Sequence, residues 1–392
     1  MPPGYPFVES ARDTLKNQNR RQTAGLIVSS RLVSNLPILV LVLVAGFVTT
    51  PASRAAPAAT IEQSMTPYLT PQRVVQVGGG RTINLVCLGR GSPTVILSAG
   101  LEAWSVWWWG VQPALAKRTR VCAWDRAGFG FSSPSPAPQD IVHTTEDLER
   151  ALNRAGIRGP YVMVGHSLGG YEALRFTDRH RQSVIGMVLV DPDIPDRAAV
   201  EERIGPPLAT LMHSEQHVKQ LQDCAAELRG GKLQRTDRQY ERCTAAPAAL
   251  APSLKAAIAR LNENPDRLLT QASTEKEHYA DSREVLNAQR RYGDMPLIVL
   301  TAAGDESSTL AALRGSPGAD TTAQLEQLRK QIALFLRDAW GPAHDAYAAL
   351  STRGRNQPVD SGHNIPINKP EVVIAAVVEI LDEMRPSGAH EP

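Results

Sequence analysis

The stretch Val162–Gly170, with the sequence VMVGHSLGG, decides the fold of this chain. Its apolar beginning predicts a buried strand, and Tyr171–Phe176 after it predicts a helix. Between them, Ser167 stands two residues from both Gly165 and Gly169, in the pattern G-x-S-x-G. A serine at the tip of so sharp a turn leaves no room for side chains two positions away. The turn exposes the hydroxyl, and the pattern therefore predicts that Ser167 is a nucleophile.

Length and charge exclude several classes of protein. The chain has 392 residues, of which 42% are hydrophobic, and a formal net charge of +2. Such a chain can bury a sizeable core in one large domain or two ordinary ones. The sequence has no basic stripe, so we expect no nucleic-acid partner.

Residues 1–59 are expected to precede the folded domain as a signal or anchor segment. Leu32–Val48 is almost wholly apolar, Arg20, Arg21 and Arg31 precede it, and Pro51–Ala59 is rich in alanine and proline. This order is typical of a secretory signal peptide or of a single transmembrane anchor. The run is slightly shorter than the roughly 20 residues that span a bilayer. We favour export to the periplasm or the medium with cleavage, and keep membrane association through Leu32–Val48 as the alternative.

The rest of the chain alternates short apolar runs with helical patterns. The strand-like runs include Thr94–Ser98, Arg120–Trp124, Tyr161–Val164, Val184–Val190 and Leu297–Thr301. Apolar strands that alternate with helices predict an α/β domain whose parallel sheet is covered on both faces. Residues 195–292 interrupt the alternation with a polar, helical pattern. We interpret them as a helical cap inserted into a core of residues 60–194 and 293–392.

The nucleophile needs a base, because a serine hydroxyl is only weakly nucleophilic at neutral pH. Of the nine histidines, His363 alone is expected in a loop between the last strand and the last helix. There it can reach the edge of the sheet that carries Ser167. His166 is adjacent to the serine and is expected to point elsewhere.

An acid must orient His363 and stabilise its charged form. Asp191 ends the strand-like run Val184–Val190, and Asp305 follows the run Leu297–Thr301. Both fit the chain order of serine, acid and histidine. We favour Asp305 and keep Asp191 as the alternative.

Two backbone N–H groups are expected to bind an oxyanion beside the serine. One belongs to Leu168, directly after Ser167. The other belongs to Leu101, in the turn after Thr94–Ser98, where Gly100 permits the turn.

Together these motifs resemble those of the α/β-hydrolase superfamily, from about Arg81 to Leu381. Besides the serine turn, the resemblance rests on Leu97–Leu101 (LSAGL), Asp125–Ser132 (DRAGFGFS) and Ser361–His363 (SGH). The resemblance implies an eight-stranded, mostly parallel sheet with helices on both faces, a triad of serine, histidine and acid, and a helical cap.

The chain departs from the usual family pattern at two points. Ala99 stands where many relatives carry a histidine before the oxyanion residue, and Gly304 directly precedes Asp305 instead of standing three residues before it. The second departure leaves the choice of acid open. A serine nucleophile also excludes the relatives that need aspartate in its place, the haloalkane dehalogenases and the epoxide hydrolases.

The residues and the resemblance predict a serine hydrolase, either a carboxylesterase or lipase or an aminopeptidase-like enzyme. We expect it to cleave an ester or amide of a small, largely apolar substrate through an acyl-enzyme intermediate, without a cofactor or metal. A carbon–carbon bond hydrolase is one alternative, with Arg126 as the obvious basic group for its substrate's carboxylate. A hydrolase-derived receptor with little turnover is the other, and fold alone does not choose between them.

The four cysteines are expected to form disulfides if the chain is exported, because an even number in an oxidising compartment favours pairing. In α/β hydrolases the strands that hold Cys87 and Cys122 are neighbours, so the resemblance implies that these two pair. Cys224 and Cys243 both lie in the expected cap, and we predict that they pair as well.

Two further groups of residues, four tryptophans and two histidines, each allow a functional and a structural interpretation. The four tryptophans within Trp104–Trp109 line an apolar pocket or, as we favour, pack in the core beneath the cap. His213 and His217 are four residues apart on an expected helix, a spacing compatible with a metal site. No carboxylate partner for them is evident in the sequence, so no metal ligand set is expected.

Overall fold

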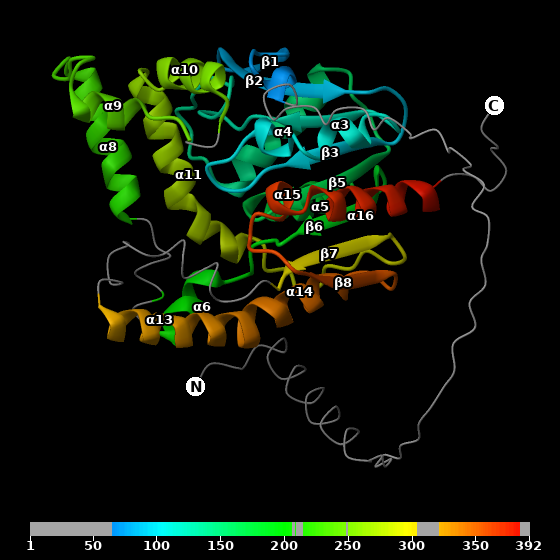
Figure 1. The fold of residues 1–392 in the computed structure, drawn as a ribbon. Coiled ribbons are helices and arrows are strands. Elements are labelled where there is room, and N and C mark those ends of the chain that lie inside the picture. Colours follow the sequence, from blue (N-terminus) through cyan, green and yellow to red (C-terminus); the bar gives the residue numbers. More distant parts are fainter. Residues whose placement is uncertain (1–64, 206–207, 209–214, 248–249, 304–320, 385–392) are drawn as a thin grey trace, which may run out of the picture. The chain divides into compact units, whose positions relative to one another are not determined.

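An eight-stranded sheet forms the centre of the structure (Figure 1). The computed structural model describes residues 65–205, 208, 215–247, 250–303 and 321–384, and Thr60–Pro392 form one compact unit. The strands lie in the order β1-β2-β4-β3-β5-β6-β7-β8. Their bounds are β1 Arg73–Gly78, β2 Arg81–Leu88, β3 Thr94–Ser98, β4 Val121–Trp124, β5 Tyr161–His166, β6 Val184–Val190, β7 Leu297–Ala302 and β8 Gly354–Val359.

Strand directions agree with the prediction of a mostly parallel sheet. The pairs β1–β2 and β2–β4 are antiparallel, and the other five pairs are parallel. Strands β3, β4 and β5 are buried at every position, as their nearly continuous apolar sequences require. The eight-stranded α/β sheet expected from the sequence is therefore confirmed.

Alternate residues of the central strands enter two apolar clusters. Ile96, Met163 and Met187 share one cluster with residues of α4, α5 and α14. Val95, Val162 and Val188 share the other with residues of α3 and α16. Since side chains along a strand point to opposite faces, these helices cover the two faces of the sheet. Their bounds are α3 Gln112–Leu115, α4 Ile141–Arg154, α5 Leu168–Arg179, α14 Gly341–Ala348 and α16 Pro370–Glu383.

Between β6 and β7 the described chain is mainly helical, as the sequence predicts for residues 195–292. The helices there are α6 Arg197–Ile204, α8 Glu215–Arg229, α9 Arg238–Thr244, α10 Pro252–Leu261 and α11 Pro265–Glu284. Helix α13, Thr322–Phe335, follows β7 but packs against α6 in an apolar cluster that includes Ile194, Leu208 and Ile332. A helix that follows β7 in the sequence therefore packs against the helical segment that precedes β7. Short helical turns complete the described elements: η1 Thr66–Tyr68, η2 Ser105–Trp108, η3 Leu336–Trp340 and α15 Ile365–Asn368.

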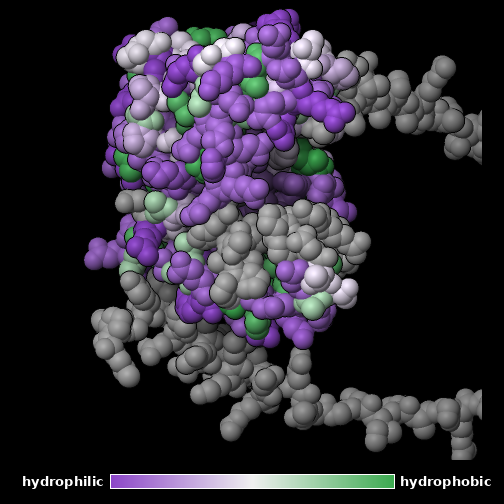
Figure 2. Space-filling model, turned by 90° about the vertical axis from the view of Figure 1, so that its left-hand side faces the viewer, coloured by the Kyte–Doolittle hydropathy of each residue, from purple (hydrophilic) through white to green (hydrophobic). Residues whose placement is uncertain are grey.

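Figure 2 shows the side of this unit on which α8, α9 and α13 lie. Hydrophilic residues cover most of its coloured surface, with hydrophobic residues scattered among them. Two of the four large hydrophobic side chains that are exposed in the described chain, Leu269 and Leu334, belong to α11 and α13. Polar residues therefore dominate the outer surface on this side of the unit.

Both predicted disulfides are confirmed. Cys87 on β2 lies directly opposite Cys122 on the antiparallel strand β4, and the two sulfurs are bonded. Cys224 on α8 is bonded to Cys243 on α9, with 5.3 Å between their Cα atoms. The second bond joins two helices of the insertion.

Among the described residues, none of the helices combines the length and the apolar character that crossing a membrane requires. The apolar run Leu32–Val48 lies outside the described residues.

Candidate active site

Ser167 occupies a strained turn between β5 and α5. Its backbone has φ 52° and ψ −123°, a positive φ that non-glycine residues rarely adopt. A Cβ atom on Gly165 would lie 2.2 Å from the carbonyl oxygen of Gly169, and one on Gly169 would lie 2.2 Å from the carbonyl oxygen of Ser98. Only glycine fits at either position, which explains the spacing G-x-S-x-G in this sequence.

Backbone hydrogen bonds connect this turn to the end of β6. The N–H of Ser167 donates to the carbonyl of Val190 over 3.2 Å. The carbonyl of Ser167 accepts from the N–H of Gly170 over 2.8 Å and from the N–H of Asp193 over 3.2 Å. Asp191 lies between these two β6-end residues, so the serine and this acid belong to one rigid edge of the sheet.

His363 lies in the loop between β8 and α15, and its Nδ1 is 2.7 Å from Oδ2 of Asp191. The carboxylate of Asp191 is 2% exposed, and its other oxygen accepts from the N–H of Ala302 over 2.8 Å and from Nε1 of Trp340 over 3.0 Å. These bonds fix the orientation of the carboxylate. The structure thus brings Asp191 to His363, whereas Asp305, favoured from the sequence, lies outside the described residues.

The charges of this group favour an ionised acid and a neutral His166. Burial alone would raise the pKa of Asp191, but the hydrogen bond and the charge of His363 lower it below its ordinary value. In His166, burial first and the neighbouring His363 second lower the pKa to about 3. The neutral ring of His166 donates from Nε2 to the carbonyl oxygen of His363 over 2.9 Å. This bond connects the histidine loop to the residue before Ser167.

The rings of His166 and His363 have centroids 4.8 Å apart, and the His363 side chain is 45% exposed. Within the described residues no hydrogen bond joins Oγ of Ser167 to Nε2 of His363. Such catalytic bonds are often long in a ligand-free enzyme and shorten when substrate binds.

The two predicted oxyanion donors belong to Leu168, directly after Ser167, and to Leu101, directly after Gly100, which lies close to the serine. Leu168 is the first residue of α5, so its N–H has no partner within the helix. On the other side, a Cβ atom on Gly100 would lie 3.2 Å from Cβ of Ser167 and 3.0 Å from Nδ1 of His166. The backbone at Gly100, directly before Leu101, therefore passes close to Ser167 and His166.

A buried ion pair holds this oxyanion turn in place. Arg126 is 2% exposed, and its Nε and Nη2 each lie 2.7 Å from an oxygen of the buried Glu172 carboxylate. Its Nη1 donates to the carbonyl of Gly100 over 2.9 Å, and its Nη2 donates to the carbonyl of Ala99. Oγ of Ser98 donates to Glu172 over 2.8 Å. From the sequence, Arg126 was a candidate for binding a substrate carboxylate. In the structure its guanidinium group is bonded instead to Glu172 and to the carbonyls of the turn.

Glu172 and Trp340 were not identified from the sequence. Glu172 lies in the first turns of α5, where an isolated glutamate in a helical pattern carries no signal of its ion pair with Arg126. Trp340 ends the helical turn η3, some 150 residues along the chain from the Asp191 that it contacts. Such contacts across distant segments leave no local pattern in a single sequence.

The tryptophans after the oxyanion turn belong mainly to the core, as favoured from the sequence. Trp104 is 4% exposed and Trp108 is 0% exposed, and each lies in an apolar cluster. Trp107 and Trp109 are partly buried against the same clusters.

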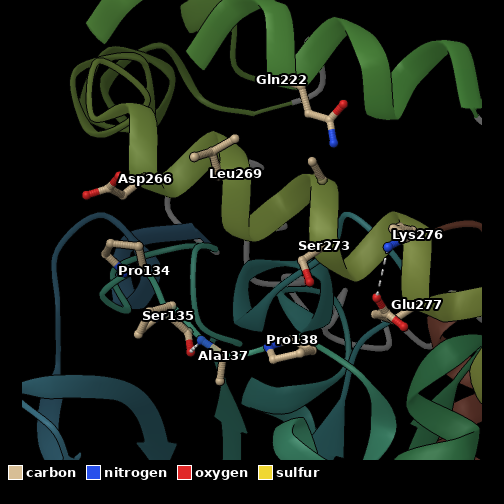
Figure 3. Close-up of a pocket in the computed structure, with 12 residues that line it drawn as sticks. Pro134, Ser135, Ala137, Pro138, Gln222, Asp266, Leu269, Ser273, Lys276 and Glu277 are labelled. Carbon is tan, nitrogen blue, oxygen red and sulfur yellow. Dashed lines mark hydrogen bonds and ion pairs between the residues drawn. The ribbon is translucent and has the colours of Figure 1, made fainter. Parts of the chain in front are cut away.

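A cavity of about 770 Å³ lies between the loop Pro134–Pro138 and the helices α11 and α8 (Figure 3). Figure 3 shows Ser273 of α11 pointing toward the loop, with Gln222 of α8 above α11. Ser167, Asp191 and His363 are absent from its lining. The cavity is therefore separate from the candidate active site.

Comparison with known proteins identifies the family to which the chain belongs. A family model described as the alpha/beta hydrolase fold matches residues 93–307, which is more than half of the chain. The uncharacterized protein C23C11.06c of Schizosaccharomyces pombe is 42% identical over 81 residues, 21% of this chain and 15% of that protein. The uncharacterized protein YqjL of Bacillus subtilis is 22% identical over 293 residues, 74% of this chain and 85% of that protein. The matches span only 15% to 37% of the length of the first three curated relatives.

The solved structure of the epoxide hydrolase CorEH has the same fold. The two chains are 19% identical, with a TM-score of 0.51, and the match covers 79% of this chain and 98% of the other. At this level of identity the likeness concerns the fold alone. The family model, the sheet order and the serine turn agree, and the chain belongs to the alpha/beta hydrolase fold family.

Proposed function

We propose that this protein is a serine hydrolase that cleaves an ester or amide of a small, largely apolar substrate. One observation carries the proposal. Ser167 is held in a strained turn whose backbone bonds to the end of β6, and there Asp191 binds Nδ1 of His363. A nucleophile, a base and an orienting acid on one rigid edge are what covalent catalysis needs.

In the proposed reaction, Oγ of Ser167 attacks the substrate carbonyl while Nε2 of His363 takes the hydroxyl proton. Asp191 stabilises the resulting imidazolium, and the N–H groups of Leu101 and Leu168 bind the oxyanion. The C–O or C–N bond of the substrate then breaks, and His363 gives its proton to the leaving group. Water hydrolyses the acyl-enzyme by the same steps, with His363 again as base, and regenerates Ser167.

The surroundings of the site weigh against a carbon–carbon bond hydrolase. Such an enzyme needs a basic group that is free to bind a carboxylate, and Arg126 is buried and bonded to Glu172. An epoxide hydrolase of the family's aspartate type requires a carboxylate where this chain has Ser167. A receptor with little turnover shares the geometry of the proposed enzyme and has to be separated from it by experiment.

The test is steady-state turnover of p-nitrophenyl esters of increasing acyl length, with aminoacyl p-nitroanilides alongside. The proposal expects many turnovers per chain for short or medium acyl groups, and none with Ser167→Ala. A single release of p-nitrophenol per chain without further turnover supports the receptor instead. Turnover that persists undiminished in Ser167→Ala contradicts the proposal.

We also propose that the chain is exported. The apolar run Leu32–Val48, the arginines before it and the disulfide Cys224–Cys243 support an oxidising destination. N-terminal sequencing of exported protein is expected to begin within residues 55–59. Full-length protein that fractionates with membranes would contradict cleavage and indicate an anchor.

A further inference from the structure

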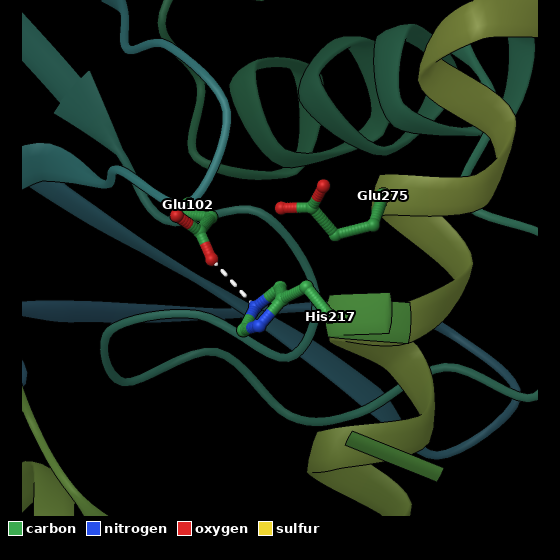
Figure 4. Close-up of side chains that lie close together, drawn as sticks. All are labelled: Glu102, His217 and Glu275. Atoms are coloured by element: carbon green, nitrogen blue, oxygen red, sulfur yellow. Dashed lines mark ion pairs between the residues drawn. The ribbon is translucent and has the colours of Figure 1, made fainter. Parts of the chain in front are cut away.

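Three potential metal ligands meet beside the oxyanion turn (Figure 4). Glu102 directly follows Leu101, His217 lies on α8, and Glu275 lies on α11. Figure 4 shows the three side chains pointing toward one another from these separate segments. Their ligand atoms all lie within 4.8 Å of one another, and Nε2 of His217 is 2.7 Å from Oε1 of Glu102. The cluster thus joins the oxyanion turn to two helices of the insertion.

The donor set has the chemistry of a zinc site. Zinc binds imidazole nitrogen and carboxylate oxygen at about 2.0–2.2 Å, so tetrahedral ligand atoms lie about 3.4 Å apart. The 2.7 Å between Nε2 of His217 and Oε1 of Glu102 would widen toward that value and the longer separations, up to 4.8 Å, would shorten, by rotation of the two glutamate side chains. From the sequence, no carboxylate partner for His217 was evident. The structure supplies two, from positions 115 and 58 residues away along the chain.

The charges of the cluster also suit a cation. Two carboxylates face one imidazole, and one of them, Glu275, is only 4% exposed. A divalent ion between them would offset the negative charge of the buried carboxylate.

The Glu102 side chain is 59% exposed and the His217 side chain is 37% exposed. An ion held there by the three residues would keep room for at least one water ligand, as in zinc sites with three protein ligands. We propose that Glu102, His217 and Glu275 bind a divalent transition-metal ion, zinc by preference, which fastens helices α8 and α11 to the oxyanion turn.

Zinc binding by the full-length protein tests this proposal. The protein is stripped with a chelator and kept without reductant, so that its cysteines stay in disulfides and do not bind metal. Competition with a chromophoric chelator is expected to give a single tight zinc ion per chain, and zinc is expected to raise Tm. Magnesium, which prefers all-oxygen sites, should not replace it at equal concentration.

Variants assign the ion to the cluster. Loss of one direct ligand in His217→Ala or Glu102→Gln is expected to weaken zinc binding by at least about tenfold and to remove the zinc-dependent rise in Tm. Glu102 is exposed, so its variant is expected to fold even if His217→Ala does not. His143→Ala is the matched control, since Nδ1 of His143 also lies 2.7 Å from one carboxylate, Asp140, but joins no three-ligand group within the described chain.

Two results would overturn the proposal. One is zinc binding weaker than about 100 µM, too weak for a built site. The other is tight binding that Glu102→Gln leaves unchanged. In either case the cluster is an ion pair between His217 and Glu102. Both readouts are independent of hydrolysis, so they stand apart from the proposed reaction of Ser167.

Discussion

The sheet and one face of helix α11 are both buried, but they bury opposite kinds of side chain. Strands β3 to β6 bury mainly apolar side chains, with valine the most frequent. Helix α11 buries a mainly polar set: Arg267, Thr270, Thr274, Glu275, His278, Asp281 and Ser282. The sheet is stabilised by apolar burial, which does not depend on particular partners. The helix depends on particular hydrogen bonds, because a buried polar group without a partner is costly.

The partners of α11 lie in the segments that lead to the active site. Arg267 donates from Nη2 to the carbonyl of Gly130 over 2.8 Å, and Asp281 accepts from the N–H of Ile141 over 2.8 Å. Nε2 of His278 lies 2.7 Å from the buried carboxylate of Asp193, two residues after Asp191. Substitutions of Ser167, Asp191 and His363 test the chemistry at the sheet edge, and substitutions in the insertion test how it is attached to these segments.

The largest expected effect is a loss of kcat on substitution of the nucleophile or its base, with the fold left intact. Ser167→Ala and His363→Ala are each expected to lower kcat by about 10⁵-fold or more, because the nucleophile and its base act as a unit. Tm should change little, since neither side chain fills the apolar clusters. Steady-state kinetics and thermal unfolding of the same preparations are the measurements. A tenth of the wild-type activity in either variant would remove that residue from the mechanism.

The next effect distinguishes the two candidate acids. Asp191→Asn is expected to lower kcat by about 10⁴-fold, because the amide stabilises the wrong tautomer of His363. Asp305→Asn, the same chemical change after the neighbouring strand, is the matched control and is expected to keep most activity. The reverse order of the two losses would assign the acid to Asp305.

A smaller effect concerns the insertion alone. Removal of the bond Cys224–Cys243 in the double Ser variant is expected to destabilise by about 3 kcal/mol, for a loop of this length. The turnover number per folded chain should stay within about twofold, since the bond lies outside the serine site. Denaturant unfolding and kinetics below the transition test both parts. A large loss of kcat in fully folded protein would show that the insertion shapes the reaction itself.

The smallest effect is a pH dependence of stability that comes from α11. Burial, assisted by the nearby Asp140 and Glu172 carboxylates and opposed by the bond from Ile141, raises the pKa of Asp281 to about 8. Between its ordinary pKa and 8 the folded protein holds a proton there that the unfolded chain releases. The contribution of this carboxyl to stability is therefore full below that range and falls as pH rises through it.

Asp281→Asn keeps an acceptor for Ile141 and removes the titration. Its Tm is expected to exceed that of the wild type by about 3 °C at pH 8 and to match it near pH 4. Asp223→Asn, at an exposed carboxylate of α8, is the control, and its Tm should differ from that of the wild type by the same amount at both pH values. Parallel Tm curves for wild type and Asp281→Asn would show that Asp281 is ionised in the folded protein.

The comparison also explains what could be predicted from the sequence. The strands and the serine turn are encoded locally, in apolar runs and in glycines that no other residue can replace. From the sequence we favoured Asp305 and kept Asp191 open, because each follows a strand at the same edge. In the structure Asp191 lies beside His363 and accepts bonds from Ala302 and Trp340, whereas Asp305 lies outside the described residues. The buried polar residues of α11 and the pair Glu102 and His217 contact residues that are distant in the sequence. A local hydrophobic pattern carries no information about such contacts.

Covalent labelling tests the central claim most directly, since that claim is a serine activated by His363 and Asp191. The native protein is exposed to a fluorophosphonate and digested, and the modified peptide is mapped by mass spectrometry. The account predicts a single adduct on Ser167, absent from Ser167→Ala and formed far more slowly in His363→Ala and Asp191→Asn. An adduct on another residue, or equal rates in all of these proteins that retain Ser167, would contradict it.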